Sequence, residues 1–200
     1  MTGGWRSQIL SLPNLVTLVR LLALPVFVWV LLGRDDRATA AFVLAFLGAT
    51  DWVDGYLARR LGQVTEVGKV LDPVADRLLL GTAVIALMID GAVPTWVAVL
   101  ALVREVVVAV GVLVLYGLGA RRVDVTLVGK AGAFSLMFAF PLFCAGSSDL
   151  SWAPVAWALA WVFALPGLVI SYWSAALYVP MARTALAEGR AARQRTEAIP

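Results

Sequence analysis

Four aspartates stand at short, regular intervals in an otherwise apolar chain: Asp51, Asp54, Asp72 and Asp76. The first two are three residues apart and the last two are four apart, so each pair lies on one face of a helix, one turn along. A charge close to hydrocarbon costs on the order of a few kcal/mol, so acids grouped beside apolar segments need a physical reason. These residue types at this spacing point to divalent metal and phosphate chemistry.

The segment between the two pairs is about long enough to make the acid-bearing helices antiparallel neighbours, which brings the four carboxylates into one cavity. Four carboxylates repel one another unless cations neutralise them. Hard divalent cations with oxygen ligands, Mg²⁺ or Mn²⁺, do this and also bind phosphate oxygens. Two such ions held by bridging carboxylates would clamp a diphosphate and stabilise charge on its leaving group.

Several of these residues also have purely structural interpretations. Asp72 precedes Pro73, which is the pattern of a helix N-cap followed by proline at the first helical position. Gly55 could serve close helix packing, and Gly68 could serve a turn. Arg59 could reach a phosphate or simply belong to the cytoplasmic excess of cations. Each residue alone is weak support for a metal site, whereas the complete spaced set is strong support.

Six apolar stretches surround the acids and predict an all-α integral membrane protein. The chain has 200 residues, of which 62% are hydrophobic and 14% charged, where a soluble domain carries about a quarter as charge. The stretches run roughly over residues 15–32, 38–50, 78–89, 94–118, 125–144 and 152–179. A spanning helix needs about 20 mainly apolar residues, which the second and third stretches reach only by including the acids. We therefore expect six transmembrane helices in one domain over residues 1–200, with a basic tail from about residue 183.

The distribution of cations predicts the orientation of these helices, because cytoplasmic loops carry an excess of lysine and arginine. Cations gather at the N-terminus, in the second and fourth connections and in the tail: Arg6, Arg59, Arg60, Lys69, Arg121, Arg122, Arg183, Arg190, Arg193 and Arg195. Both termini and the acids should therefore face the cytoplasm at the cell membrane. A sequence pI near 9.4 fits an anionic leaflet rather than nucleic acid. The chain has no histidine and one cysteine, Cys144, which excludes a histidine base and an internal disulfide.

At the acidic residues the chain resembles the CDP-alcohol phosphatidyltransferase family, whose signature is D-x2-D-G-x2-A-R-x8-G-x3-D-x3-D. All eight positions are met within 26 residues: Asp51, Asp54, Gly55, Ala58, Arg59, Gly68, Asp72 and Asp76. The run PNLVTLVR and the six-helix layout extend the similarity across most of the chain.

The resemblance implies transfer of a phosphatidyl group from CDP-diacylglycerol to an alcohol, with release of CMP, by an enzyme with two metal ions. It implies that Asp51, Asp54 and Asp72 are metal ligands and that Asp76 is both a ligand and the base for the acceptor hydroxyl. Further residues would line the cytidine-diphosphate pocket: Gly55, Ala58, Arg59 and Gly68. The resemblance also implies a homodimer.

The acceptor alcohol depends on cations elsewhere in the apolar stretches. Arg104, Lys130 and Arg121 could hold an acceptor phosphate, although Arg104 could instead pair with Glu105 and Lys130 could reach the interface. Phosphatidylglycerophosphate synthases share the Arg-Glu pair and usually read Gly-Lys-x-Lys-Thr, whereas this chain reads GKAGA from position 129. The stretches VGKAGAFSLMFAFP and YWSAALYV resemble the actinobacterial branch associated with cardiolipin synthesis. We expect phosphatidylglycerol as acceptor, with glycerol 3-phosphate as the alternative.

Two other classes of membrane protein are weaker interpretations of the same residues. A transporter would carry its acids near the membrane midplane within repeated halves, but here the acids lie at one boundary and the halves show no matching acidic segments. A structural protein acting through its basic tail would leave the spaced aspartates unexplained. Metal-dependent release of CMP separates an enzyme from both.

Overall fold

The computed structural model describes residues 12–61, 68–117 and 127–197, and it describes side chains in residues 18–50, 77–111, 114, 129 and 131–176. The helices are α2 (Leu12–Val28), the π-helical turn η1 (Trp29–Gly33), α3 (Arg37–Leu61), α4 (Gly68–Asp90), α5 (Thr95–Gly117), α6 (Leu127–Gly146) and α7 (Ala153–Glu197). Within the described ranges there are six α-helices and no strand. The expectation of an all-helical chain is confirmed, and helices α3 and α4 do extend through the acids.

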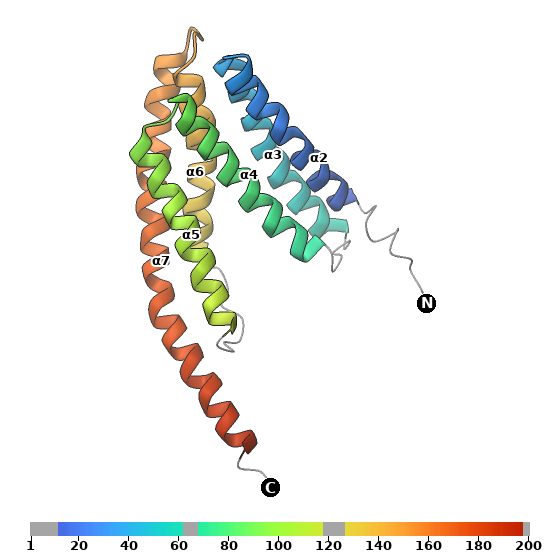
Figure 1. The fold of residues 1–200 in the computed structure, drawn as a ribbon, viewed down its shortest axis with the longest axis vertical. Helices are drawn as coiled ribbons and strands as arrows, with labels where there is room; N and C mark the ends of the chain where they lie inside the picture. The colour runs from blue at the N-terminus through green and yellow to red at the C-terminus, as the bar shows by residue number, and fades with distance from the viewer. Residues whose placement is uncertain (1–11, 62–67, 118–126, 198–200) are drawn as a thin grey trace.

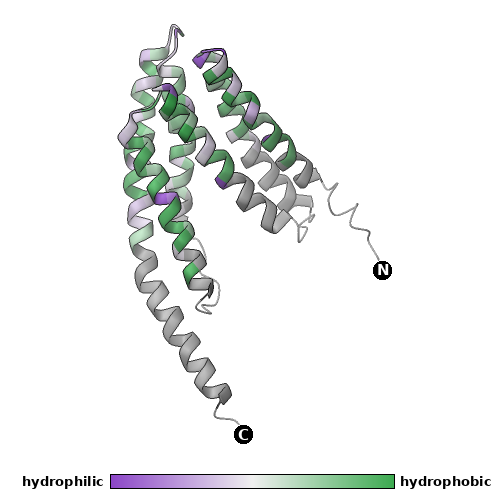
Figure 2. Ribbon diagram, in the orientation of Figure 1, coloured by the Kyte–Doolittle hydropathy of each residue, from purple (hydrophilic) through white to green (hydrophobic). Residues whose placement is uncertain are grey.

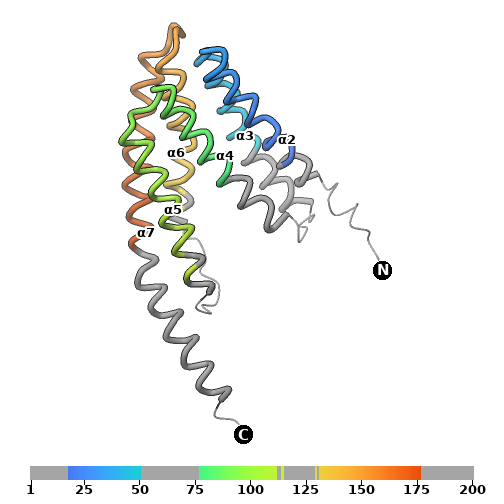
Figure 3. The backbone as a smooth tube through the Cα atoms, in the orientation of Figure 1, coloured from blue at the N-terminus to red at the C-terminus, as the bar shows by residue number. Residues whose placement is uncertain are grey.

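The helices form two groups of three (Figure 1). In the first group α2 packs against both α3 and α4, and in the second group α7 packs against both α5 and α6. The groups touch through α3 with α6 and through α4 with α5. Figures 1 and 3 show them close together where α4 and α6 end, and spreading apart toward the opposite end. The spreading end is the one at which α3 ends and α4 begins.

Apolar residues make up most of the described helices (Figure 2). Some of them are buried between the helices and others are exposed. Phe27, Leu31, Val84 and Phe143 are fully buried, while Val106 and many other large apolar residues are exposed. Among the described residues, one helix segment, 153–176, is long and apolar enough to cross a membrane, and three apolar helix segments are shorter. An outer surface rich in large apolar residues is expected where lipid replaces water.

Helices α6 and α7 approach each other closely because glycines line their interface. A Cβ added at Gly132 would lie 2.9 Å from the backbone nitrogen of Ser171, and one at Gly146 would lie 2.7 Å from that of Trp157. Ser135 on α6 also donates a 2.7 Å hydrogen bond to the carbonyl of Phe163 on α7. Small residues at helix contacts are typical of membrane proteins, in which close backbone packing stabilises association.

Two helix ends are capped by local hydrogen bonds, the start of α3 and the end of α4. Asp36 caps α3, because its carboxylate accepts hydrogen bonds from the Thr39 backbone N–H (2.9 Å) and from the Thr39 hydroxyl (2.6 Å). These bonds lower the pKa of Asp36. At the other end of the first group, α4 stops at Gly91, whose φ of 78° is the left-handed conformation. Gly91 and Ala92 donate backbone hydrogen bonds to Met88 and Leu87, which is a Schellman motif.

Candidate active site

The spaced acids lie on two helices at the spreading end of the molecule. Asp51 and Asp54 belong to the last part of α3, and Asp72 and Asp76 belong to the first part of α4. Both pairs therefore have the helical spacing that places two side chains one turn apart. The side chains of these four residues lie outside the described set, as do those of Ala58 and Arg59. The mutual geometry of the ligands thus stays a prediction.

The capping interpretation of Asp72 is wrong. Helix α4 begins at Gly68, so Asp72 stands one turn inside the helix and Pro73 is not its first residue. An acid at that depth no longer satisfies the free N–H groups at a helix start. Gly68 is the first residue of α4 rather than part of a separate turn.

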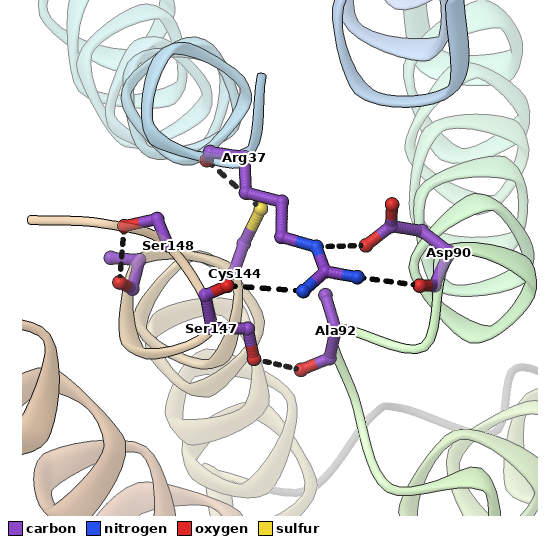
Figure 4. Close-up of polar contacts among 7 residues, drawn as sticks. Arg37, Asp90, Ala92, Cys144, Ser147 and Ser148 are labelled. Carbon is purple, nitrogen blue, oxygen red and sulfur yellow. Dashed lines mark hydrogen bonds and ion pairs between the residues drawn. The ribbon is translucent and has the colours of Figure 1, made fainter. Parts of the chain in front are cut away.

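A polar cluster joins three helix ends at the opposite pole from the acids (Figure 4). The guanidinium of Arg37 donates from Nε to the carboxylate of Asp90 (2.8 Å), from Nη2 to the Asp90 carbonyl (2.8 Å) and from Nη1 to the Ser147 carbonyl (3.1 Å). The Ser147 hydroxyl donates to the carbonyl of Ala92 (3.0 Å), and the Cys144 thiol donates to the carbonyl of Arg37 (3.3 Å). The start of α3 and the ends of α4 and α6 are thereby held together.

The Arg37 cluster is electrostatically favourable because cations stabilise the carbonyl ends of helices. Arg37 supplies one positive charge to the ends of both α4 and α6, and it neutralises Asp90, whose side chain is only 5% exposed. The cluster holds the two helix groups together at this pole. At the opposite pole, where α3 ends and α4 begins, the two groups spread apart (Figure 1).

Arg104, one of the three residues that the sequence assigns to the acceptor, is buried on α5 and 8% exposed. Its Nη1 pairs with Oε1 of its neighbour Glu105. The other carboxylate oxygen of Glu105, Oε2, lies 4.0 Å from Nη1 of Arg77 on α4. The Nε of Arg104 has no hydrogen-bond partner among the described residues. Arg104 therefore pairs with Glu105, as the structural alternative expected, yet it keeps one buried N–H unused.

The other two acceptor candidates are only partly placed. Lys130 lies in the first turn of α6, at the same end of the molecule as the acids, and its side chain lies outside the described set. Arg121 lies outside the described residues altogether. Gly132, which stands where the related motif carries its second lysine, is buried and lies against Ser171 of α7. A cation at position 132 would have to displace the backbone of α7.

Sequence reasoning assigned no role in the site to Arg20 or Arg77, and it considered Glu105 as a charge inside an apolar stretch and a possible partner of Arg104. Arg20 is 4% exposed within the apolar helix α2. Arg77 follows Asp76 directly on α4, and Glu105 lies between two arginines. The sequence signal that could have found Arg20 and Arg77 is a charge inside an apolar stretch, which by default marks a functional position.

An apolar cavity of about 380 Å³ lies between α3 and α6. Its wall on α3 runs from Ala41 to Ala49, a rise of about 12 Å at 1.5 Å per residue. Ala49 is two residues before Asp51, and Phe134 on the opposite wall is one turn after Lys130. The cavity therefore begins beside the level of the acids and continues toward the opposite pole.

Comparison with known proteins decides the family. Residues 10–173 match the sequence profile described as CDP-alcohol phosphatidyltransferase. That range contains all eight signature positions and most of the six helices. The chain belongs to the CDP-alcohol phosphatidyltransferase family. It is thus an enzyme of a membrane-bound family of phosphatidyltransferases, and its spaced aspartates occupy the family signature.

Relatives in this phosphatidyltransferase family carry names for two different reactions. A Streptomyces coelicolor protein named "Cardiolipin synthase (CMP-forming)" is 35% identical over 181 residues, covering 88% of this chain and 84% of the relative. A Bacillus subtilis protein named "CDP-diacylglycerol--glycerol-3-phosphate 3-phosphatidyltransferase" is 34% identical over 143 residues, covering 64% and 74%. A Mycobacterium tuberculosis protein named "Probable phosphatidylglycerophosphate synthase" is 44% identical over 110 residues, covering 52% and 53%.

Proposed function

We propose that this enzyme transfers a phosphatidyl group from CDP-diacylglycerol to phosphatidylglycerol, forming cardiolipin and releasing CMP. Family membership supports phosphatidyl transfer in phospholipid biosynthesis. The observation that carries the choice of acceptor is the contact of Gly132 with Ser171, which closes the position of a second acceptor cation.

The donor half of the site is proposed on the two acid-bearing helices. The family generally depends on divalent metal, and the donor set fits Mg²⁺ or Mn²⁺ because it consists of carboxylate oxygens without histidine. The proposed ligands of two ions are Asp51, Asp54, Asp72 and Asp76. When bound, the ions would neutralise the diphosphate and stabilise charge on the leaving CMP. The proposed pocket for the cytidine diphosphate consists of Gly55, Ala58, Arg59 and Gly68.

Asp76 is proposed as the base. Its carboxylate takes the proton of the acceptor hydroxyl as that oxygen forms a bond to the phosphorus bearing the diacylglycerol. The bond from this phosphorus to the bridging oxygen breaks, and CMP leaves with that oxygen. The chain contains no histidine, and the family resemblance supports a carboxylate, that of Asp76, in this role.

The charge balance at the acceptor side supports a phosphodiester. A phosphate monoester such as glycerol 3-phosphate carries about −1.5 to −2 at pH 7, whereas the phosphodiester of phosphatidylglycerol carries a single negative charge. The charge of Arg104 is already balanced by Glu105, and Gly132 replaces a cation. The proposed acceptor residues are Arg104, Lys130 and Arg121, with Arg104 as a hydrogen-bond donor whose charge Glu105 balances. Together they carry less positive charge than the related motif provides.

The apolar cavity between α3 and α6 supports lipid substrates. It begins two residues from Asp51, so a lipid whose head group reaches the acids could bury part of an acyl chain there. Burial of each CH₂ group is worth about 0.8 kcal/mol relative to water, although chains in the bilayer are already buried. The cavity therefore positions a chain rather than driving its binding.

The membrane arrangement is proposed from the same features. We propose six transmembrane helices in one domain over residues 1–200, with both termini and the active site on the cytoplasmic side and a basic tail from about residue 183. Exposed tryptophans at the opposite pole support a membrane interface there: Trp29, Trp96 and Trp152. A homodimer is proposed from the family resemblance, with the exposed apolar faces of the helices available to it.

A specific observation keeps glycerol 3-phosphate as the second candidate acceptor. The Mycobacterium tuberculosis relative named for phosphatidylglycerophosphate synthesis shows 44% identity, although over only 52% of this chain. The cardiolipin synthase relative matches 88% of the chain at 35%. The match to the cardiolipin synthase relative is longer, 181 residues against 110.

The test is an assay of the purified enzyme with CDP-diacylglycerol and Mg²⁺ or Mn²⁺, with each acceptor offered in parallel and the lipid product identified by mass. Cardiolipin with phosphatidylglycerol alone is the expected result. Phosphatidylglycerophosphate as the sole product would show that closing position 132 does not exclude the smaller acceptor. Release of CMP without either lipid product, with both acceptors supplied, would indicate hydrolysis and count against both transfer reactions.

Variants at the proposed ligands, base and acceptor cation separate their roles. Asp76→Asn should abolish turnover while binding of CDP-diacylglycerol is largely retained, and retained activity would remove Asp76 as the base. Asp51→Asn should weaken the metal dependence, so an unchanged Mg²⁺ titration would count against its role as a ligand. Lys130→Ala should raise the KM of the acceptor more than that of CDP-diacylglycerol, and equal effects would refute its acceptor role.

A further inference from the structure

Glu105 stands between two cations that belong to different parts of the proposed site. Its Oε1 pairs with Nη1 of Arg104, which is proposed for the acceptor, and its Oε2 lies 4.0 Å from Nη1 of Arg77. Arg77 directly follows Asp76, the proposed base, on α4. The carboxylate therefore connects the helix of the proposed base to the helix of a proposed acceptor residue.

This connection lies where the two helix groups begin to spread. Of the ion pairs whose two side chains are both described, Arg77–Glu105 joins α4 to α5. The Arg37 cluster holds the groups together at the far pole, and α4 and α5 separate toward the acids (Figure 1). This ion pair therefore links α5 to the residue that follows the proposed base Asp76 on α4.

Of the two arginines that Glu105 approaches, Arg104 is the more deeply buried and therefore depends more on this carboxylate. Arg104 is 8% exposed, while the side chain of Glu105 is 22% exposed and that of Arg77 is 45% exposed. A buried guanidinium is stable only when its charge and its N–H groups find partners. Glu105 pairs with Nη1 of Arg104. The buried Nε of Arg104 has no hydrogen-bond partner among the described residues.

A guanidinium held in this way is oriented for an anion. The guanidinium is planar and its N–H groups have a fixed arrangement, so pairing one nitrogen fixes the direction in which the other N–H groups point. The unused Nε of Arg104 can donate to a phosphate oxygen of the acceptor, which would also satisfy the buried N–H. A role of Glu105 in simple charge neutralisation would require only the contact with Arg104, not the additional approach to Arg77.

We propose that Glu105 is a positioning residue that orients Arg104 toward the acceptor phosphate and couples it to Arg77 beside the base. The inference rests on the proposed function for the role of Arg104 and Asp76. Glu105 itself need not touch either substrate. It acts through the two arginines by fixing the position of Arg104, on the acceptor side, relative to Arg77 beside the proposed base.

The test compares Glu105→Gln, Glu105→Asp and Arg77→Gln with the unmodified enzyme. The glutamine variant keeps the size of the side chain and removes its charge, so it should raise the acceptor KM by about tenfold and leave the KM of CDP-diacylglycerol within about twofold. The aspartate variant keeps the charge and should recover part of that loss. Arg77→Gln should lower kcat, and combining it with Glu105→Gln should cost less than the product of the single effects.

A merely structural role predicts a different set of results. It would lower the melting temperature and the active fraction of Glu105→Gln while changing neither KM, or it would raise both KM values together. Either result, or fully multiplicative effects in the double variant, would overturn the proposal. If the glutamine variant does not fold, the aspartate variant still supplies the KM comparison and Arg77→Gln still supplies the kcat comparison.

A second measurement does not depend on turnover. Phosphatidylglycerol and glycerol 3-phosphate are each added to the enzyme without CDP-diacylglycerol, and the rise in melting temperature is followed as a binding signal. The acceptor that stabilises the unmodified enzyme should stabilise Glu105→Gln clearly less, and equal stabilisation would overturn the proposal. Failure of the proposed function would instead appear as an unmodified enzyme that binds an acceptor but transfers no phosphatidyl group to it.

Discussion

Replacing Gly132 by alanine should destabilise the enzyme, although alanine is the better helix former. Gly132 lies in α6 directly against Ser171 of α7, which is fully buried. A Cβ at position 132 would lie 2.5 Å from the Ser171 Oγ, 2.9 Å from its backbone nitrogen and 3.1 Å from its Cα. The hydroxyl can rotate away, but the backbone of α7 can yield only if the two helices move apart.

The size of the effect follows from these distances. Ordinary contact begins at 3.4 Å, so the backbone nitrogen must withdraw by 3.4 − 2.9, or 0.5 Å. Overpacking of this kind costs about 1–3 kcal/mol, and the higher helix propensity of alanine offsets up to about 1 kcal/mol. A net loss of about 1–2 kcal/mol in a chain of 200 residues corresponds to a melting temperature lower by roughly 2–8 °C.

The assay is thermal unfolding of the purified protein in detergent, followed by tryptophan fluorescence at one fixed heating rate because unfolding of such proteins is often irreversible. Gly111→Ala on α5 is the matched control, since nothing lies within 4 Å of its added Cβ, and it should be neutral or stabilising. Adding Ser171→Gly to Gly132→Ala should restore only part of the loss, because the backbone contacts remain. A Gly132→Ala protein as stable as the Gly111→Ala protein would refute the close contact and the argument about the acceptor that depends on it.

Three further perturbations test the ends of the helices. Gly91→Ala should cost about 1–2 kcal/mol, seen as a lower melting temperature, because φ at this position is 78°; an unchanged melting temperature would contradict the left-handed turn. Arg37→Met should cost about 3–5 kcal/mol by leaving the buried carboxylate of Asp90 unpaired, and adding Asp90→Asn should recover part of this loss, whereas additive losses would show that the pair does not interact. Hydrogen bonds from the Thr39 side chain and backbone lower the pKa of Asp36, so its stabilising effect is present above the ordinary aspartate pKa of about 4 and is lost as pH falls through the lower folded value. An Asp36→Asn protein should accordingly lose less stability than the unmodified enzyme on acidification, and identical melting curves against pH would exclude this contribution.

Much of the fold could be predicted from the sequence because its determinants are local. Apolar stretches long enough for helices, interrupted by short polar connections, predict the number and order of the helices. The need for spanning length also predicted that α3 and α4 extend through the acids, which the structure bears out. The family and its reaction followed from eight residues at fixed spacing, Asp51 to Asp76, since metal and diphosphate chemistry restricts those positions directly.

Local patterns misled where two interpretations shared the same residues. Asp72 followed by Pro73 has the composition of a helix start, yet α4 begins at Gly68. The pattern of an N-cap depends on two or three residues, whereas the start of α4 depends on the whole segment. Similarly, Arg37 has aspartates beside it in sequence but pairs with Asp90, 53 residues away.

The spacing of the acids, the apolar segments and the cation distribution were sufficient to identify a membrane phosphatidyltransferase and to name its candidate ligands. They could not identify which residues meet across helices, because such contacts depend on how far each helix is rotated about its axis and where it crosses its neighbours. The contact between Gly132 and Ser171, the position of Glu105 between two arginines and the joining of three helix ends by Arg37 are of this kind. A shift of one residue along a helix turns a side chain by about 100°, so these partners are defined only once the six helices have packed together.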